Sequence, residues 1–406
     1  MYDVLVVGAG PTGSYVASRL AAAGRKVVVF EQNHRIGKAT CCTGIVGKDC
    51  FDAFPVCSTA VLREARSARF FAPSGRCLRV EAATTQAYIL DRLALDAALA
   101  RSAQEQGAEY WLGSRVTDIV AADDSIHARV AVNGRSLNVR AKTAVIACGF
   151  GSRLSRNLGL GAHGDFAMGA QSQVETNGTQ EVEVYFGSRT APGFFAWVVP
   201  TSDNRALAGL LSRQHTGARL RCFLRSLVEQ GKVASCQATI SFGGVPLEPA
   251  HRTSGHRVLL VGDAAGQVKP TTGGGIYYGL LSAQVAADTL EEALRRNDFT
   301  ATALARYDRG WRAMLSAELK AGRRARWFFE RLNDRQIEWL FETAESRRIP
   351  ERLAQSPDFC FDRHGRVIRR GARLLGLEGI LGLLWSFVRN LPLNQVERGK
   401  LRPAAP

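Results

Sequence analysis

The sequence predicts an α/β protein with a Rossmann-type dinucleotide-binding domain, an antiparallel sheet and a helical C-terminal region. A glycine-rich segment at residues 8–13 follows an apolar run and precedes a helix-forming stretch. A second glycine-rich segment, residues 262–276, lies about 250 residues further along the chain. Between them, residues 165–212 have the pattern of four antiparallel strands, and the pattern from residue 299 onward is helical.

The first glycine-rich segment lies in a unit ordered as strand, tight turn, helix and strand. Gly8 makes the turn, Gly10 lets the backbone approach a pyrophosphate, and Gly13 lets the helix pack closely on the strand. Pro11 and Thr12 stand at the helix N-terminus, which faces the negative charge of a bound nucleotide. The segment therefore predicts a dinucleotide site.

An acidic residue ends the second strand of this unit. Glu31 follows the apolar run at residues 27–30, which places its carboxylate to accept hydrogen bonds from ribose hydroxyls. The same charge would repel a 2′-phosphate. The nucleotide is therefore expected to be FAD or NAD rather than NADP.

The second glycine-rich segment chooses between these two cofactors. Residues 258–261 have the pattern of a buried strand, which ends at Gly262 and Asp263. An aspartate at this place can bind a ribityl hydroxyl, although the alternative is that Asp263 only caps the following turn. The backbone amides beyond it can contact the phosphate and the pyrimidine oxygens of a flavin. We assign these contacts to Gly273, Gly274, Gly275 and Ile276, so that the expected cofactor is FAD.

Composition excludes several classes of protein. With 406 residues, of which 46% are hydrophobic and 22% charged, the chain is typical of a globular protein of two or three domains. Its nine cysteines form no C-x-x-C pair and have no histidine at zinc spacing, so no metal site is expected. The odd number of cysteines and the lack of an N-terminal signal peptide pattern favour a cytoplasmic protein with free thiols.

The charge is strongly positive, with a formal net value of +16. Many of the excess cations lie after residue 294, interleaved with aromatic residues and followed by an apolar stretch at residues 374–391. This combination favours peripheral contact with an anionic membrane face, through an interfacial or buried helix rather than a transmembrane one. The alternative is a helical lid that packs on the other domains. Nucleic-acid binding has no motif in its favour, so no nucleic-acid partner is expected.

The expected domains interleave along the chain. Residues 1–164 form the first part of the FAD-binding domain, with residues 55–90 contributing to the substrate domain. The antiparallel-sheet substrate domain covers residues 165–245, residues 246–298 complete the FAD-binding domain, and residues 299–406 form the helical region. Within the first part, further strands are expected at residues 114–121, 127–132, 136–140 and 143–147.

These motifs resemble those of the geranylgeranyl reductase family, flavoproteins of the p-hydroxybenzoate hydroxylase-like fold that include the digeranylgeranylglycerophospholipid reductases. The resemblance spans residues 1 to about 296 and is carried by residues 8–13, 42–44, 91–92, 192–200 and 262–276. It implies further contacts with FAD from Cys42, Thr43, Gly44 and Arg92.

The resemblance implies an FAD-dependent oxidoreductase that reduces carbon–carbon double bonds of geranylgeranyl or other polyprenyl chains. Reduced FAD would deliver a hydride to one carbon while a proton reaches the other. The protein must then hold a long apolar chain over the flavin, exclude water and place one acid. The expected partners are an isoprenoid lipid or prenyl substrate and an external electron donor, either NAD(P)H or a ferredoxin-like protein.

Four residues are candidates for the catalytic site. Phe195 and Trp197 are expected to form an apolar ceiling over the flavin, unless they are ordinary core residues on one face of a strand. Cys42 is expected to sense redox state, gate the cavity or donate a proton, unless it is an inert buried thiol. Tyr277 is expected either to line the pocket or to pack its helix.

Three other functions compete with this interpretation. An aromatic monooxygenase or halogenase shares the fold, but Cys148 stands where hydroxylases carry an aspartate, and Phe195 stands where halogenases carry a tryptophan. A non-redox flavoprotein of the lycopene cyclase type is the second alternative, and a flavin scaffold without catalysis is the third.

Overall fold

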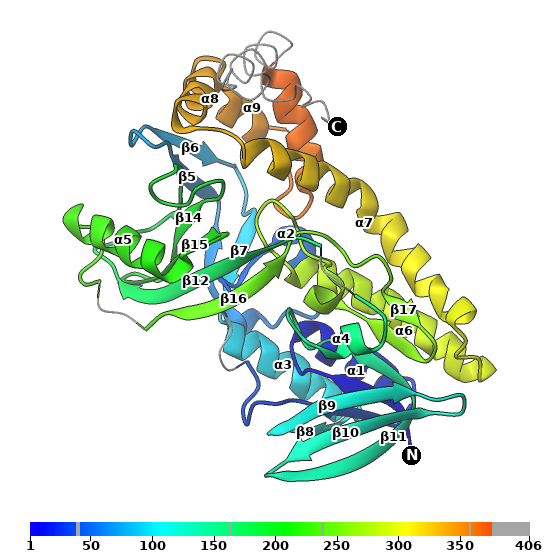
Figure 1. Cartoon of the computed structure of the whole chain (residues 1–406). Coiled ribbons are helices and arrows are strands. Elements are labelled where there is room, and N and C mark those ends of the chain that lie inside the picture. The colour runs from blue at the N-terminus through cyan, green and yellow to red at the C-terminus, as the bar shows by residue number, and fades with distance from the viewer. Residues whose placement is uncertain (38–40, 162–163, 237–238, 357–358, 376–406) are drawn as a thin grey trace, which may run out of the picture.

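The computed structural model describes residues 1–375 except residues 38–40, 162–163, 237–238 and 357–358. This part of the chain contains an eight-stranded, a seven-stranded and a three-stranded sheet. The eight-stranded sheet lies at the end of the molecule that holds the N-terminus. Helices of the C-terminal region run from there along the molecule to its opposite end (Figure 1). The expected fold class is confirmed.

Five parallel strands form the centre of the eight-stranded sheet. They run in the order β8-β2-β1-β11-β18, and β17 adds an antiparallel edge. These strands are β1 (Tyr2–Val7), β2 (Val27–Phe30), β8 (Glu109–Trp111), β11 (Arg135–Ile146), β17 (Ser254–Gly255) and β18 (Val258–Leu260).

Alternation along these strands buries both faces of the sheet. Val4 and Val6 face a core formed with helices α1 (Pro11–Ala22), α3 (Arg92–Glu105) and α6 (Ile276–Arg296). Leu5 faces the opposite core, which strands β9 (Ser114–Ala121) and β10 (Ile126–Val132) cover. This burial explains why the central strands are almost continuous apolar runs.

One sequence expectation in this sheet is wrong. Residues 136–140 and 143–147 were expected to form two strands, whereas the structure has the single strand β11. Its first half pairs antiparallel with β10, and its second half pairs parallel with β1 and β18. Residues 135–140 are mostly exposed and residues 141–146 mostly buried, so the change in sequence pattern marks a change of environment within one continuous strand.

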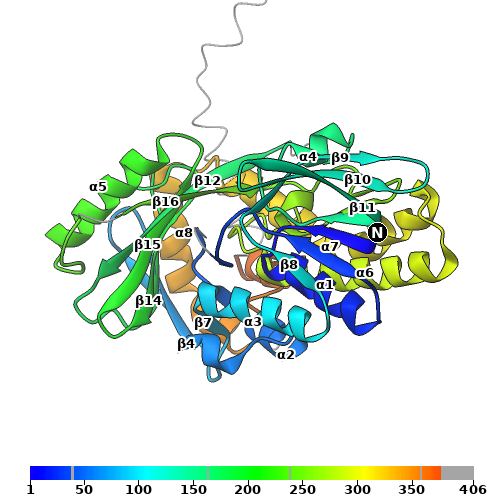
Figure 2. The same cartoon turned by 90° about the horizontal axis from the view of Figure 1, so that it is seen from below.

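The seven-stranded sheet forms the other half of the molecule and has the order β16-β12-β15-β14-β13-β5-β6. Helix α5 (Thr216–Glu229) covers its outer face, on the side away from the N-terminal sheet (Figure 2). Strand β13 pairs with β5 in parallel, although about 110 residues separate them. The strands are β5 (Ser67–Phe71), β6 (Cys77–Glu81), β12 (Phe166–Glu175), β13 (Val182–Tyr185), β14 (Ala196–Ser202), β15 (Arg205–Ser212) and β16 (Ser241–Pro246).

A small sheet with the order β3-β7-β4 is formed by the stretch of chain between β2 and α3, and the short helix α2 (Lys48–Ala53) follows its first strand. Its strands are β3 (Ile45–Gly47), β4 (Val61–Ala65) and β7 (Ala87–Leu90).

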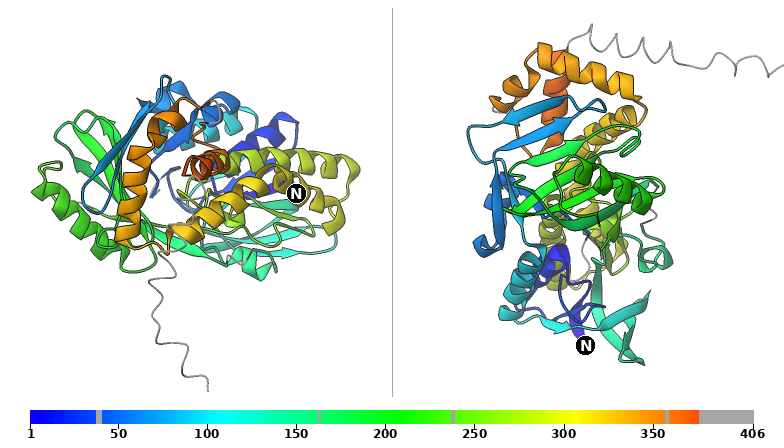
Figure 3. Two further views of the ribbon diagram at one scale, coloured as in Figure 1. Left: turned by 90° about the horizontal axis from the view of Figure 1, so that it is seen from above. Right: turned by 90° about the vertical axis from the view of Figure 1, so that its left-hand side faces the viewer.

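Helix α7 (Ala301–Phe329) connects the two halves of the molecule. Its first half is anchored by Tyr307 and Trp311, which are fully buried, and the Tyr307 hydroxyl donates a hydrogen bond to the Leu260 carbonyl at 2.7 Å. Helix α8 (Asp334–Ser346), drawn in orange, then packs on β5 and β6, drawn in blue (Figure 3). Helix α9 (Ile349–Ala354) and a helical stretch at residues 364–375 follow.

No helix in the described part of the chain is both long enough and apolar enough to cross a bilayer. The apolar stretch expected at residues 374–391 lies outside the described residues from residue 376 onward.

Candidate active site

The first glycine turn combines tight packing with one open position. Gly8 has a φ of +101°, and a Cβ atom on it would lie 2.6 Å from the carbonyl oxygen of Ala147. A Cβ atom on Gly13 would lie 2.1 Å from the carbonyl oxygen of Gly8. A Cβ atom on Gly10, the N-cap of α1, would meet nothing within 4 Å. The helix N-terminus therefore presents bare backbone to open space, as a bound pyrophosphate requires.

Glu31 holds this turn in place. Its carboxylate accepts hydrogen bonds from the backbone amide of Ala9 at 3.0 Å and from the backbone amide of Asn33 at 2.9 Å. It also accepts one from the side chain of Asn33 at 2.8 Å. A carboxylate has about four lone-pair sites, so these bonds leave room for a ribose hydroxyl.

Thr12 links the two glycine-rich segments. A Cβ atom on Gly279 would lie 2.6 Å from the Thr12 hydroxyl oxygen, and one on Gly262 would lie 2.9 Å from it. The side chain of Thr12 therefore occupies a notch that exists because both of these positions are glycine. Pro11 is the first residue of α1, where its missing N–H costs no hydrogen bond.

Asp263 is a partly exposed carboxylate without a hydrogen-bond donor. None of the described residues donates to its side chain, and burial raises its pKa to about 6, opposed by the positive charge of Arg92. A Cβ atom on Gly275, the N-cap of α6, would lie 2.5 Å from the Asp263 carboxylate. An unpaired carboxylate beside a helix N-terminus fits the ribityl hydroxyls of a flavin.

The glycine loop before α6 closes on Lys269. The backbone amide of Gly273 donates to the Lys269 carbonyl at 2.9 Å, and the amide of Lys269 donates to the Gly274 carbonyl at 3.1 Å. Gly273 has a φ of +76°, and a Cβ atom there would lie 3.1 Å from the side chain of Val245 in β16. Ile276 is the first residue of α6. The loop thus lies between the helix and the seven-stranded sheet.

The side chain of Arg92 is nearly buried rather than at the surface. Its guanidinium pairs with Asp96, one turn further along α3, at 3.0 Å, and both side chains are nearly buried. The Cys42 thiol lies beside the same guanidinium, and although burial opposes it, the interactions with Cys42 and Asp96 raise the pKa of Arg92. The loop that contains Thr43 is held by the Gly44 amide, which donates to the Cys42 sulfur at 3.4 Å.

Trp197 is tied to this loop through a residue that the sequence did not single out. Gln171, Gly209 and Trp197 are direct partners on the neighbouring strands β12, β15 and β14. A Cβ atom on Gly209 would lie 2.5 Å from the indole ring, so this glycine lets the ring reach across the strand. The Trp197 indole N–H donates to the Gln171 side-chain oxygen at 3.3 Å, and the Gln171 amide group donates to the Cys42 carbonyl at 3.2 Å.

Phe195 extends the aromatic surface away from this link. Its ring lies 5.9 Å from that of Trp197 and 6.4 Å from that of Phe186. Phe186 in turn contacts Phe329 of α7 at 5.3 Å. Phe195 and Trp197 alternate with Ala196 along the chain; Ala196 is buried in the core with α5, and the two rings are partly buried and pack against that core. A row of aromatic side chains therefore leads from the Cys42 loop to the C-terminal helices.

Tyr277 lies in a different environment from the other three catalytic candidates. Its ring is buried in the core between the helices, 6.1 Å from Phe54 and 6.3 Å from Tyr278. Burial raises the pKa of Tyr277, opposed by Arg363, which lies close to its hydroxyl. The structure brings Cys42, Phe195 and Trp197 to one face of the sheet and leaves Tyr277 in a packing position.

The C-terminal segment contacts the glycine loop before α6 and the start of α2. The Lys269 ammonium pairs with the Asp362 carboxylate at 2.9 Å, and both side chains are almost completely buried. Asp362 also accepts hydrogen bonds from the backbone amides of Gly47 at 3.2 Å and Cys50 at 3.0 Å. Next to this pair, the side chain of Thr271 forms a hydrogen bond with His364. Burial lowers the pKa of His364 to about 3, so its imidazole is neutral at physiological pH.

A family model described as an FAD binding domain matches residues 1–314, which is more than half of the chain. The bare helix N-terminus at Gly10 and the unpaired carboxylate of Asp263 fit this cofactor. The fold and the site therefore define a flavoprotein whose cofactor is FAD.

Sequence relatives show to which family of flavoproteins the chain belongs. The chain is 31% identical to the digeranylgeranylglycerophospholipid reductase of Methanothrix thermoacetophila over 346 residues, which cover 82% of this chain and 88% of that protein. It is 29% identical to the protein of the same name from Methanocaldococcus jannaschii over 347 residues, with the same coverage of 82% and 88%. The chain belongs to the digeranylgeranylglycerophospholipid reductase family, which confirms the resemblance seen in its motifs.

Solved structures share the fold. A geranylgeranyl bacteriochlorophyll reductase-like protein from Thermoplasma acidophilum superposes with a TM-score of 0.81 and 22% identity, covering 96% of this chain and 98% of the other. A variant of the halogenase PltM in complex with FAD superposes with a TM-score of 0.66 and 15% identity, covering 92% of this chain and 86% of the other. The same architecture therefore occurs in proteins with different names.

Proposed function

We propose that this protein is an FAD-dependent reductase of carbon–carbon double bonds in geranylgeranyl or other polyprenyl chains. The observation that carries the proposal is the aromatic surface of Trp197, Phe195 and Phe186, which begins at the Cys42 loop. The names of the sequence relatives support the same substrate class.

One set of residues would bind the cofactor, and another would position the substrate. The bare turn at Gly10 and the N-terminus of α1 would hold the pyrophosphate, Glu31 the ribose, and Asp263 the ribityl chain. Arg92 lies beside Asp263 and Cys42 and would complete the polar lining. When FAD is bound and reduced, it supplies the hydride.

The seven-stranded sheet would position the prenyl chain. Phe195 and Trp197 offer flat apolar surfaces that orient the chain and exclude water from the reacting carbons. The hydrogen bonds of Gln171 fix Trp197 relative to the Cys42 loop, so this surface and the polar lining are held as one unit. Cys42 is the candidate proton donor because it carries a thiol where the two surfaces meet.

One anaerobic experiment tests the function. The purified flavoprotein is reduced with dithionite and mixed with geranylgeranyl substrates, and the mass of the product is measured. We expect a gain of two hydrogens for each double bond reduced, and no change when dithionite is omitted. A product that gains oxygen or a halogen once air and halide are admitted would identify a monooxygenase or halogenase, and an isomer of unchanged mass would identify a cyclase.

The electron donor and membrane contact form a second part of the proposal. The net charge of +16 suits an acidic ferredoxin-like donor and an anionic membrane face, and NAD(P)H is the other candidate donor. Stopped-flow bleaching of the flavin by each donor identifies the functional one. Peripheral contact predicts that the protein sediments with phosphatidylglycerol vesicles at low salt and is released at high salt, whereas sedimentation independent of salt would contradict an electrostatic contact.

A further inference from the structure

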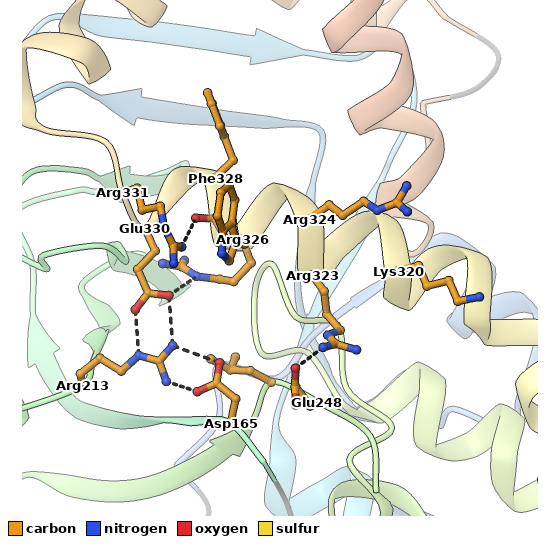
Figure 4. A pocket seen from close by; sticks show the side chains of 12 residues that line it. Asp165, Arg213, Glu248, Lys320, Arg323, Arg324, Arg326, Phe328, Glu330 and Arg331 are labelled. Carbon is orange, nitrogen blue, oxygen red and sulfur yellow. Dashed lines mark hydrogen bonds and ion pairs between the residues drawn. The ribbon is translucent and has the colours of Figure 1, made fainter. Parts of the chain in front are cut away.

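A pocket of about 1040 Å³ lies where α7 crosses one end of the seven-stranded sheet (Figure 4). It is formed by the C-terminal part of α7, the start of β12, the end of β15 and the segment after β16. We call it the basic pocket because six cationic side chains line it: Arg213, Lys320, Arg323, Arg324, Arg326 and Arg331.

The acidic residues of the basic pocket are already paired. Arg213 bridges Asp165 and Glu330, and its guanidinium lies 2.8 Å from the Glu330 carboxylate. Arg323 pairs with Glu248, the remaining acid of the lining (Figure 4). Six cations face three acids, so the lining carries three positive charges in excess.

Three of the cations are left without a carboxylate. Lys320, Arg324 and Arg331 form no ion pair within the part of the chain that the structure describes. In Figure 4, Lys320 and Arg324 extend away from the paired carboxylates. Arg331 instead stacks on the ring of Trp327 at 3.9 Å, and this tryptophan is 60% exposed.

Arg326 is the most constrained of the six. It is only 6% exposed, and its Nε and one Nη are buried without a hydrogen-bond partner. Its guanidinium stacks on Phe194 at 3.8 Å, and the nearest carboxylate, that of Glu330, is 3.9 Å away. Burial lowers its pKa to about 10, opposed by Glu330. Buried donors without acceptors destabilise a fold, so their retention points to an absent acceptor.

We propose that the basic pocket binds the phosphate group of the prenyl substrate, with the Arg326 guanidinium as its buried contact. This inference rests on the proposed function, because a polyprenyl chain held on the apolar sheet must carry a polar group at one end. Phosphate offers several charged acceptor oxygens and suits the planar donors of arginine, whereas a carboxylate would leave more of the excess charge unpaired.

The basic pocket lies close to the glycine loop before α6. Arg213 is two residues beyond Leu211, and a Cβ atom on Gly273 would lie 3.8 Å from that leucine. On α7, a Cβ atom on Gly322 would lie 3.1 Å from Pro270 at the start of the glycine loop. The exposed Trp327 at the rim supplies an amphipathic surface of the kind found where proteins meet lipid.

Calorimetric titration of the FAD-loaded protein tests this assignment without requiring turnover. The probes are geranylgeranyl phosphate and geranylgeraniol at one detergent concentration. We expect the wild-type protein to bind the phosphate at least about tenfold more tightly than the alcohol. Arg326→Gln should abolish this preference, and Arg326→Lys should retain part of it. The matched control is Arg309→Gln, an exposed position on the same helix outside the basic pocket, which should keep the full preference.

Competition with inorganic phosphate distinguishes a site that recognises any phosphate from one that recognises phosphate only when it is attached to a prenyl chain. Competition shows that phosphate alone is recognised, and its absence shows that the phosphate is recognised together with the chain; both support the proposal when Arg326→Gln loses the preference. A wild-type preference below twofold, or an Arg326→Gln protein that keeps the preference, overturns it. If Arg326→Gln does not retain FAD, the exposed double variant Lys320→Gln/Arg331→Gln replaces it, and an unchanged preference there also overturns the proposal. A protein that binds the phosphate but reduces nothing refutes the proposed function alone.

Discussion

Gly10 and Gly13 belong to the same turn, but glycine is required at the two positions for different reasons. Gly13 is required by the fold, because a Cβ atom there would press on the Gly8 carbonyl at 2.1 Å. Gly10 is not, since a Cβ atom there would meet no protein atom within 4 Å. The sequence motif treats these glycines alike, whereas the structure separates a folding constraint from a binding constraint.

Substitution by alanine should separate the two effects. Gly10→Ala is expected to fold with wild-type stability and to bind FAD at least about tenfold more weakly, because the added methyl group occupies the space in front of the helix N-terminus. Gly13→Ala is expected to lose about 1–3 kcal/mol of stability through overpacking. Urea denaturation of the apoproteins and fluorescence titration with FAD measure both quantities. Equal destabilisation by the two variants would contradict the distinction.

Asp263 should show a trade between stability and binding. Burial raises its pKa to about 6, whereas an unfolded aspartate titrates near its ordinary value of about 3.9. A raised pKa means that the ionised carboxylate destabilises the folded apoprotein, fully above about pH 6 and not at all well below pH 4. Asp263→Asn should therefore melt higher than the wild-type apoprotein at pH 7, and this advantage should shrink as the pH falls from 6 to 4.

The same variant should bind FAD about tenfold more weakly, because it replaces a charged acceptor with a neutral one. Thermal melts of flavin-stripped protein at pH 7 and pH 4, followed by FAD titration, provide the measurements. An advantage in melting temperature that is independent of pH would show that the carboxylate is not the cause.

Cys42 can be tested as the proton donor with two variants of graded chemistry. Cys42→Ala removes the ionisable group, and we expect kcat to fall by at least about a hundredfold, in the range of general acid catalysis, while FAD stays bound. Cys42→Ser replaces the thiol with a hydroxyl group of similar size that can still donate a proton. This variant should retain part of the activity. Single-turnover oxidation of the reduced flavin by substrate reports the step directly. A Cys42→Ala protein within about threefold of wild type would assign the thiol a packing role.

At the scale of elements, the seven-stranded sheet and the Cys42 loop are coupled through Gln171, which bonds to Trp197 at 3.3 Å and to the Cys42 carbonyl at 3.2 Å. Gln171→Leu keeps much of the volume but removes both bonds. We expect a loss of about 1–3 kcal/mol of stability, because it leaves partly buried groups without partners. Hydrogen exchange at residues 41–47 should accelerate, and kcat should fall with FAD content unchanged.

The control for this prediction is Gln173→Leu on the same strand. Gln173 is exposed, and its side chain forms no hydrogen bond within the described part of the chain. Gln173→Leu should leave both the hydrogen exchange at residues 41–47 and the activity as in the wild type. If the two variants behave alike, the coupling through Gln171 is not what holds the loop.

Elements determined by local signals were predictable from the sequence. Helix α3 opens at Arg92 because Asp91, a residue type favoured at helix N-caps, accepts hydrogen bonds from the Leu93 amide at 2.8 Å and the Ala94 amide at 3.2 Å. Strand β2 has the expected bounds because an apolar run between turns is itself a local pattern.

Features that depend on distant partners were not predictable. The pairing of β5 with β13 and the bond from Gln171 to Cys42 join segments more than 100 residues apart, and no periodicity records which segments meet. Lys269 and Asp362 form a buried pair although they are 93 residues apart; Lys269 lies in the glycine-rich segment at residues 262–276, but Asp362 stands in no motif that marks it as the partner. Sequence patterns therefore predicted the glycine-rich turns but not the contacts that hold them together.

At the scale of the whole molecule, one buried ion pair joins the C-terminal region to the glycine loop before α6. Lys269 belongs to the glycine loop, and Asp362 comes from beyond α9; their side chains are 5% and 0% exposed. Asp362 also binds the amides of Gly47 and Cys50 at the start of α2. One carboxylate thus joins three parts of the chain, which explains why the C-terminal region is integral to the site rather than an appended lid.

Removing this carboxylate should loosen all three parts together. Asp362→Asn leaves the Lys269 ammonium buried without its counter-charge, for which we expect a loss of about 3–5 kcal/mol and faster release of FAD. The double variant Lys269→Met/Asp362→Leu removes both charges and should recover part of the stability, because two apolar side chains avoid the cost of a lone buried charge. Asp52→Asn, which breaks the exposed pair of Asp52 with Lys48, should leave the unfolding free energy of the holoprotein unchanged. Urea unfolding and the dissociation rate of FAD are the measurements. Wild-type FAD retention in Asp362→Asn would show that the flavin loop holds its shape without the C-terminal region.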